Sequence, residues 1–543
     1  MSGKFTKLAL TAFMALSLGA STALASSINA PLTIAANTVN NPILGQQSDR
    51  ISQVNEPATG APSSTAPLVE NAPNAVETNQ QTEPSQSDQS QQVLPDIEKI
   101  GDAYRFTLEN GLQVIVLPNH RAPVITQMVW YRAGSADENP GTTGIAHFLE
   151  HLMFKGTKTY PGDEFNQTIS RLGGQQNAFT SYDYTAYFQS VASQYIEEMM
   201  KREADRMLNL VLSEDDITSE RQVIIEERRM RTDNSPAAML SEESRATLFL
   251  NSPYHNPVIG WKQEMEALSR EDAINFYHKF YTPNNATLIL AGDITPEKAR
   301  ELSLATFGKL EKRSSPPQKR IRPQEPVSRT QRVVTMRDPR VSNESFQHLW
   351  VVPSYNNAKT GQAEALDLLG EILGGSQRSR LYTKFVVQEG KAASVGSGYS
   401  GVSVDDGIFY VYAMPRNNNT LEELQSEINE VIADIAKNGV SEAELNQARE
   451  RFIRAIIYSQ DSPSGLANIY GAALSTGQTL ETIHEWPERL KKVTPEAIKE
   501  AAKAYLDGDK GVVSYLLPPK GEKPREDATS ATPAMGTDES EQQ

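Results

Sequence analysis

The chain has 543 residues, of which 38% are hydrophobic, and its formal net charge is −16. This length is too great for a single hydrophobic core, so we expect at least two domains. The acidic balance argues against nucleic acid as the main partner, and the absence of cysteine excludes disulfides and a lipid-modified cysteine.

The first 25 residues have the pattern of a secretory signal peptide. Lys4 and Lys7 form a basic start, Leu8 to Ala20 form an apolar centre, and small residues precede a cleavage site after Ala25. The alternative is a membrane anchor, but the apolar run is shorter than the roughly 20 residues that a membrane span needs. The sequence therefore predicts export, best to a bacterial periplasm, with no integral membrane segment after signal removal.

Composition divides the rest of the chain into five segments. Residues 26–95 are rich in Ser, Asn, Gln, Pro and Thr and predict a disordered tether, while residues 521–543 predict a disordered acidic tail. Between them we expect one domain over 96–310 and another over 329–520. A Pro-rich, basic linker over 311–328 would join these two domains.

The two expected domains resemble each other. The helix-then-strand pattern "LSREDAINFYHKFYTPNNATLILAGD" from Leu268 returns as "VTPEAIKEAAKAYLDGDKGVVSYLLPP" from Val493, and an apolar helix follows both Gly144 and Gly361. The offsets of the two pairs, 225 and 217 residues, are nearly equal. We therefore predict two homologous α+β domains, each a mostly antiparallel sheet packed with helices.

The stretch "TTGIAHFLEHLMFKG" predicts a helix that carries a metal site. Thr142 or Thr143 is expected to cap this helix and Gly156 to end it. On such a helix His147 and His151 lie one turn apart on the same face, so their imidazoles converge as two ligands of Zn²⁺ must.

Three glutamates accompany this histidine pair. Glu150 borders the same face, where a carboxylate can take a proton from an attacking water. Glu220 and Glu227 lie two turns apart in a second predicted helix, "SEDDITSERQVIIEERRM". Alone they would be read as solvated helix charges, but a catalytic zinc site needs a third protein ligand. The order H-x-x-E-H also marks a metallopeptidase class of its own.

Three segments, "HFLEHLMFKGT", "RLGGQQNAFTSYDYTAYF" and "ERQVIIEERR", resemble the pitrilysin–insulinase family of zinc peptidases. The branch with mitochondrial processing peptidases and their bacterial relatives is the most similar. The resemblance covers roughly Tyr104 to Pro519. It implies one Zn²⁺ per chain and two homologous domains that form half of a clam-shell chamber.

The resemblance also implies roles for single residues. The metal ligands would be His147, His151 and Glu227, and Glu150 would be the general base. Glu220, seven residues before the third ligand, would support the site from behind. Glu226 is a rival ligand, but it breaks this seven-residue spacing.

The segment "GGQQNAFTSYDYTAY" predicts a turn followed by a strand. In the family this is an edge strand beside the metal, and substrate adds to it as a further strand. Asn177 and Ala178 match the residues that contact substrate there, although an ordinary sheet strand is an equal alternative. Tyr184 and Tyr187 are expected in the core or the wall of the site.

The second domain departs from the family pattern. Val386 and Ala393 stand where single-chain members carry an arginine and a tyrosine that bind substrate and the oxyanion. At the 217-residue offset, the His, Glu and His of the motif become Glu364, Asp367 and Leu368. The chain thus holds the metal half of a site, and a paralogous partner subunit is expected to supply the Arg/Tyr pair.

These observations predict an exported zinc endopeptidase that cleaves short or unfolded polypeptides with such a partner. One alternative is that Arg378, Arg380 or Tyr399 replaces the missing pair. A second is a catalytically weak scaffold or assembly subunit of the same fold. A third is a metal-dependent hydrolase with non-peptide substrates, which the edge-strand motif disfavours.

Overall fold

The computed structural model describes residues 94–520, with gaps at 318, 417–418 and 460–461. The predicted signal peptide and acidic tail, and nearly all of the predicted tether, lie outside the described residues. Within the described part of the chain, no helix is both long and apolar enough to cross a membrane.

The first domain contains a seven-stranded sheet and eight helices. Its strands are β1 (Glu98–Ile100), β2 (Ala103–Thr107), β3 (Gln113–Pro118), β4 (Val124–Tyr131), β5 (Gln175–Thr180), β6 (Thr185–Ala192) and β7 (Ala286–Gly292). Its helices are α1 (Ile145–Leu152), α2 (Glu164–Arg171), α3 (Ile196–Asn209), α4 (Glu214–Arg228), α5 (Pro236–Leu248), α6 (Lys262–Met265), α7 (Arg270–Phe280) and α8 (Pro296–Ala305).

The second domain contains a five-stranded sheet and six helices among its described residues. Its strands are β8 (Gln331–Arg337), β9 (Ser345–Val352), β10 (Ala392–Ser400), β11 (Gly407–Pro415) and β12 (Gly511–Leu517). Its helices are α9 (Gln362–Leu373), α10 (Leu421–Asn438), α11 (Glu442–Ser459), α12 (Pro463–Thr476), α13 (Leu480–Lys491) and α14 (Pro495–Ala501).

The two sheets have the same topology. The first has the order β1-β2-β3-β7-β4-β6-β5, and the second repeats its last five strands as β8-β12-β9-β11-β10. Only the β3–β7 and β8–β12 pairs are parallel among the described strands. The predicted α+β class with two homologous, mostly antiparallel domains is therefore confirmed.

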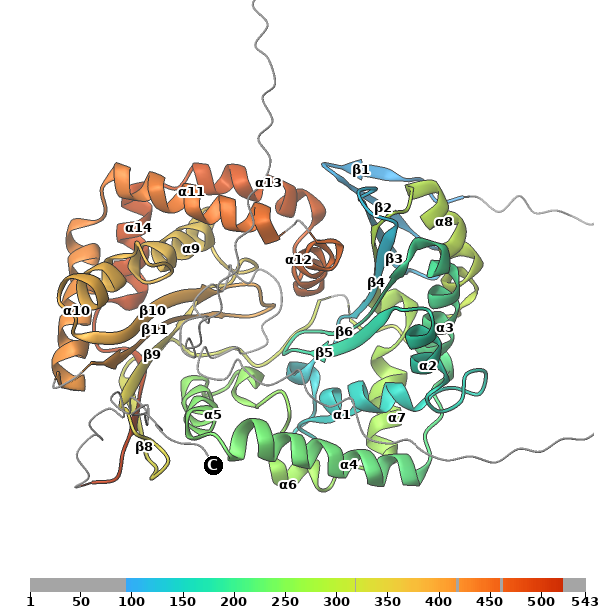
Figure 1. The fold of residues 1–543 in the computed structure, drawn as a ribbon, viewed down its shortest axis with the longest axis horizontal. Helices are drawn as coiled ribbons and strands as arrows, with labels where there is room; N and C mark the ends of the chain where they lie inside the picture. The colour runs from blue at the N-terminus through green and yellow to red at the C-terminus, as the bar shows by residue number, and fades with distance from the viewer. Residues whose placement is uncertain (1–93, 318, 417–418, 460–461, 521–543) are drawn as a thin grey trace, which may run out of the picture.

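One helix of each domain packs against the sheet of the other domain (Figure 1). Helix α12, which follows the second domain's α11, packs on β4 and β7 of the first sheet, and α5 packs on β8 and β12 of the second. The contact of α12 is so close that a Cβ at Gly471 would lie 2.0 Å from the ring of Trp130. This exchange ties the two domains into one unit.

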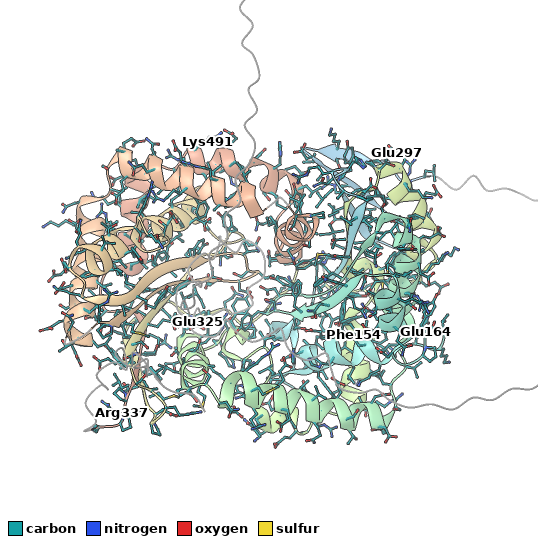
Figure 2. All side chains as sticks on the ribbon, viewed as in Figure 1. Phe154, Glu164, Glu297, Glu325, Arg337 and Lys491 are labelled. Atoms are coloured by element: carbon teal, nitrogen blue, oxygen red, sulfur yellow. The ribbon has the colours of Figure 1, made fainter. Side chains whose placement is uncertain are left out.

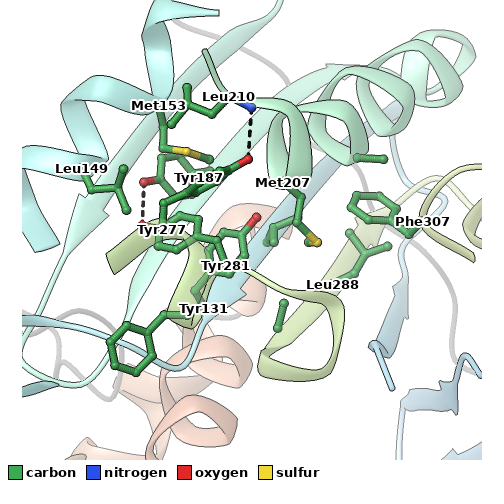
Figure 3. Packing of buried hydrophobic residues seen from close by; sticks show 14 of the residues in the cluster. Tyr131, Leu149, Met153, Tyr187, Met207, Leu210, Tyr277, Tyr281, Leu288 and Phe307 are labelled. Atoms are coloured by element: carbon green, nitrogen blue, oxygen red, sulfur yellow. Dashed lines mark hydrogen bonds between the residues drawn. The ribbon is translucent and has the colours of Figure 1, made fainter. Parts of the chain in front are cut away.

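The strand alternation gives the first sheet two apolar faces. In β7, Leu288 and Leu290 face the main core under α1, α3 and α7, while Ile289 faces the cluster that α12 covers. Figure 3 shows part of the main core, where the hydroxyls of Tyr187 and Tyr281 lie 3.0 Å apart. The prediction that Tyr184 and Tyr187 are core residues is confirmed, since both are at most 2% exposed.

The segment that connects the domains is fixed to both of them. Arg322 is 8% exposed and pairs with Asp137 (2.8 Å) and Asp183 (2.5 Å) of the first domain. It also pairs with Asp405 of the second domain at 3.3 Å. Glu325 accepts hydrogen bonds from three backbone N–H groups that follow α5, and Figure 2 shows it between the two halves. The connecting segment is thus held by ion pairs and hydrogen bonds to both domains.

One buried histidine, His348, is expected to make the stability of the second domain depend on pH. The His348 ring stacks on Trp350 at 3.6 Å and its Nε2 donates to the carbonyl of Lys510. Burial lowers its pKa to about 4 from 6.5. Between these two values the unfolded chain binds the proton and the folded chain does not, so stability is lost as pH falls.

We expect His348→Gln, which keeps an N–H donor, to weaken this pH dependence. Between pH 7 and about pH 4.5, the free energy of unfolding of the wild type should fall by about 2–3 kcal/mol more than that of the variant. Urea unfolding of both proteins, with a chelator present so that metal loss does not contribute, measures this difference. An equal loss in both proteins would show that His348 titrates normally.

Candidate metal centre

The start of helix α1 is not capped as predicted. Neither Thr142 nor Thr143 caps it, because Gly144 occupies the N-cap position with φ of 88°. Instead the carboxylate of Glu138 accepts hydrogen bonds from the N–H groups of Gly144 and Ala146, both at 2.9 Å. An acidic side chain at a helix N-terminus accepts hydrogen bonds from N–H groups that have no partner within the helix, and a negative charge there interacts favourably with the helix dipole.

The histidine pair lies on α1 as predicted. The rings of His147 and His151 are 4.7 Å apart between centroids. Helix α4 crosses this face of α1 and starts with a capping box, in which the side chains of Ser213 and Asp216 each accept a hydrogen bond from the other's backbone N–H. The α4 helix directs two glutamates, Glu220 and Glu227, to the histidines.

These glutamates take different positions. Glu227 Oε2 lies 3.5 Å from His147 Nε2 and 3.3 Å from His151 Nε2. Glu220 Oε1 lies behind His151, 2.9 Å from its Nδ1. Glu226 is on the outer face of α4, where it pairs with Arg229 and its side chain is 56% exposed.

The group formed by His147, His151 and Glu227 fits a single zinc ion. One ligand atom of each residue lies within 4.8 Å of the others. Glu227 Oε2 is buried and makes no hydrogen bond of good geometry, although both histidines are near. Two imidazole nitrogens and one carboxylate oxygen converge here, and the carboxylate oxygen is buried without a hydrogen bond. These three atoms are the donor set of a catalytic zinc site.

The charges in this group compensate one another without metal. Burial opposes the charge on His151, but its contacts with Glu220 and Glu227 outweigh burial and raise its pKa to about 9. Burial lowers the pKa of His147 to about 4. Contact with His151 holds the pKa of Glu227 at about 2 against burial. Because a histidine ligates metal in its neutral form, protonation of His151 and metal binding compete.

Glu150 lies beside the metal group and is not part of it. It is 9% exposed, and its Oε2 accepts a hydrogen bond from Thr180 Oγ1 at 2.6 Å. Burial raises its pKa to about 7, against the opposing effect of this hydrogen bond. A carboxylate with such a pKa can take up and release a proton near neutral pH.

Strand β5 brings Thr180 to Glu150 and is the last strand of its sheet, paired only with β6 among the described strands. The side chain of Asn177 is exposed and accepts a hydrogen bond from the N–H of Ala178, its neighbour on the same strand. Both predicted contact residues therefore lie on an edge strand next to the metal group.

The described part of the second domain has no hydrogen-bond donor side chain at the two positions where the family carries its arginine and tyrosine. Val386 packs against the core of its own domain, and Ala393 is an exposed residue at a break in the β10–β11 register. Two suggested substitutes are already engaged, since Arg380 pairs with Glu444 at 2.8 Å and the Tyr399 hydroxyl donates to a backbone carbonyl.

The positions that match the metal motif are filled in another way. Glu364 pairs with Arg489 at 2.6 Å, and Asp367 accepts from the hydroxyl of Tyr355. Leu368 is fully buried in the core of the second domain. The copied helix α9 therefore has structural partners where α1 has a metal group.

Sequence reasoning missed the residues that hold the site in place. Glu138 caps α1, Thr180 bonds Glu150, Lys155 lies 2.5 Å from Glu220, and Arg231 lies 3.0 Å from Glu227. Of these contacts, only the four-residue spacing between Glu227 and Arg231 is a recognisable sequence signal. The others depend on the fold.

Comparison with known proteins agrees with this geometry. Residues 113–262 match the family described as "Insulinase (Peptidase family M16)", and residues 267–452 match "Peptidase M16 inactive domain". The chain is 30% identical over 436 residues to the zinc protease PqqE of Helicobacter pylori, a match that covers 79% of this chain and 94% of that protein.

Solved structures show the same fold. The crystal structure of a protease from Helicobacter pylori has a TM-score of 0.70 at 30% identity and covers 78% of this chain and 100% of that one. The periplasmic protease PqqL from Escherichia coli has a TM-score of 0.65 at 20% identity, and the match spans 77% of this chain but 48% of that chain. In fold, this chain corresponds to half of the longer protein.

Proposed function

Because this chain belongs to the insulinase family of zinc proteases, peptidase family M16, we propose that it is an exported endopeptidase that cleaves short or unfolded polypeptides with a paralogous partner subunit. The observation that carries the proposal is the convergence of His147, His151 and Glu227 beside the buried Glu150. Export rests on the sequence of the first 25 residues.

The residues of the first domain divide the chemistry between them. His147, His151 and Glu227 would hold Zn²⁺, which would supply a Lewis acid to polarise a scissile carbonyl and to favour deprotonation of water. Thr180 fixes Oε2 of Glu150, so Oε1 takes the proton from the attacking water and then gives it to the leaving amine. The burial that raises the pKa of Glu150 suits it to both transfers.

Substrate would bind in extended form along β5. The free edge of this strand offers backbone N–H and C=O groups to a peptide, with Asn177 and Ala178 as contact residues. Since Thr180 of the same strand bonds Glu150, a peptide paired with β5 would pass beside the proton-transfer group. An extended segment, such as one in a short or unfolded polypeptide, can pair in this way.

A partner subunit is proposed because the two positions of the second domain that correspond to the family's arginine and tyrosine carry Val386 and Ala393. Neither Val386 nor Ala393 can donate a hydrogen bond to an oxyanion, and Arg380 and Tyr399 are engaged elsewhere. A second chain with an arginine and a tyrosine at these positions would complete the site and close the chamber.

We expect the purified chain to bind zinc and to hydrolyse peptide slowly. Loss of one oxyanion donor typically costs about 10²–10³-fold in turnover, so the paralogue should raise the rate by at least that factor. Measurements of zinc content, native mass and cleavage of a quenched peptide, with and without the paralogue, test this.

Two variants serve as controls for this experiment. A paralogue whose arginine and tyrosine are changed to Val and Ala should still associate but should not stimulate cleavage. The double variant Val386→Arg with Ala393→Tyr should replace the paralogue when it is mixed with the wild-type chain. Vigorous turnover by the chain alone, unchanged by the paralogue, would contradict the partner proposal. A chain without zinc or activity in any combination would favour a scaffold.

A further inference from the structure

Each of the two α4 glutamates next to the histidines has one carboxylate oxygen near a histidine and the other near a cationic side chain. Glu220 has Oε1 on His151 and Oε2 on Lys155 Nζ, at 2.9 and 2.5 Å. Glu227 has Oε2 toward the histidines and Oε1 3.0 Å from Nη2 of Arg231. The two oxygens of Glu227 therefore have different environments before any metal binds.

Arg231 lies in an unusual stretch of backbone. Helix α4 continues into a π-helical turn, Arg229–Asp233, which closes with a hydrogen bond from the Asn234 N–H to the Arg229 carbonyl at 2.9 Å. Two further π-helical segments, Tyr382–Gln388 and Ala502–Leu506, lie in the second domain, so the position of this turn and not its type is what matters here. The turn is fixed on one side by Arg228, which is 7% exposed and makes a two-pronged contact with Glu242.

The second domain fixes the other side of this turn. Arg340, in the loop after β8, donates to the carbonyl of Asn234 at 2.9 Å. The backbone that carries Arg231 is thus held from both domains, while the Arg231 side chain is 75% exposed and the Glu227 side chain 12%. An ion pair whose cation is three-quarters exposed adds little to folding stability, so the contact is better explained by its effect on Glu227.

We propose that Arg231 is a positioning residue for the third metal ligand. It holds Oε1 of Glu227 away from the histidines, so that only Oε2 is presented to the metal. Without Arg231 the carboxylate is free to rotate about its last side-chain bond, and either or both oxygens can turn toward the histidines. This inference rests on the assignment of Glu227 as the third ligand.

The expected effect is on metal affinity more than on folding. Partners that orient a metal ligand from behind typically contribute about 10–100-fold to affinity. We therefore expect Arg231→Gln to weaken Zn²⁺ binding by about 10–100-fold, with an unchanged free energy of unfolding for the metal-free protein. Competition with a chromophoric zinc chelator measures this affinity without any activity assay.

The same helix offers a matched control. Arg229 pairs with Glu226 at 2.8 Å, and both side chains are more than half exposed, but Glu226 does not face the metal group. Arg229→Gln removes the same charge two residues away and should leave Zn²⁺ affinity unchanged. Arg231→Lys, which retains a cation, should recover part of the affinity.

Cobalt provides a second readout. The visible absorption of bound Co²⁺ depends on the number and arrangement of ligand atoms, so it should change in Arg231→Gln and not in Arg229→Gln. Wild-type Zn²⁺ affinity and an unaltered Co²⁺ spectrum in Arg231→Gln would overturn the inference, as would equal losses in both variants. Full zinc retention in Glu227→Ala would overturn the ligand assignment itself, which separates the two failures.

Discussion

Glu150→Gln is expected to retain zinc and to lower peptide hydrolysis by about 10²–10⁴-fold, the usual contribution of a general acid–base group. Glu150 is not one of the three residues that converge on a metal position. Glutamine has the same shape, and its amide oxygen can accept the hydrogen bond from Thr180. The substitution thus removes proton transfer and leaves the metal group and packing in place.

The experiment measures zinc by elemental analysis and cleavage of a quenched peptide in the presence of the paralogue. Glu226→Gln is the matched control, because it changes the same side chain on an exposed face of α4 and should have normal zinc and activity. Near-normal turnover of Glu150→Gln would assign the proton transfer to another group. Zinc loss in this variant would instead make Glu150 a ligand.

The parts of the fold that follow from local geometry could be predicted from sequence. A helix places residues four apart on one face, so the convergence of His147 and His151 was readable from spacing. The same holds for Glu220 and Glu227, two turns apart on α4. The repeat was also readable, because two copies of one topology need the same order of apolar helices and strands.

Contacts between distant segments could not be predicted in this way. A proline-rich, basic stretch is typical of a linker, yet Arg322 in that stretch is buried against Asp137, Asp183 and Asp405. The threonines before α1 had the right chemistry for a cap, but Glu138 takes the role because its loop returns over the helix start. The sequence shows which groups need hydrogen-bond or charge partners, but the tertiary fold decides which residues those partners are.

The exchange of α5 and α12 has the same origin. Which sheet α5 and α12 each cover depends on the path of the chain between the domains. The packing of these two helices on the opposite sheets, together with the ion pairs of Arg322, holds the two domains of one chain in a fixed relation. Opening of a chamber would then take place between subunits, which agrees with the proposed partner.

Alanine at any one of His147, His151 or Glu227 is expected to abolish tight zinc binding, and with it all zinc-dependent cleavage. Each residue supplies one of three protein ligands, and two ligands are too few for a tight catalytic site. Removal of Glu227 also leaves two histidines whose rings are 4.7 Å apart without a facing carboxylate. Zinc per chain after dialysis, measured for each variant, tests this.

Glu226→Ala decides which of two adjacent glutamates is the ligand. The seven-residue spacing from Glu220 favoured Glu227, and the geometry supports it, since Glu227 Oε2 lies within 3.5 Å of both imidazoles while Glu226 pairs with Arg229 on the surface. Glu226→Ala should therefore keep its zinc. Zinc loss in Glu226→Ala together with retention in Glu227→Ala would move the ligand by one residue and require α4 to be rotated from its position here.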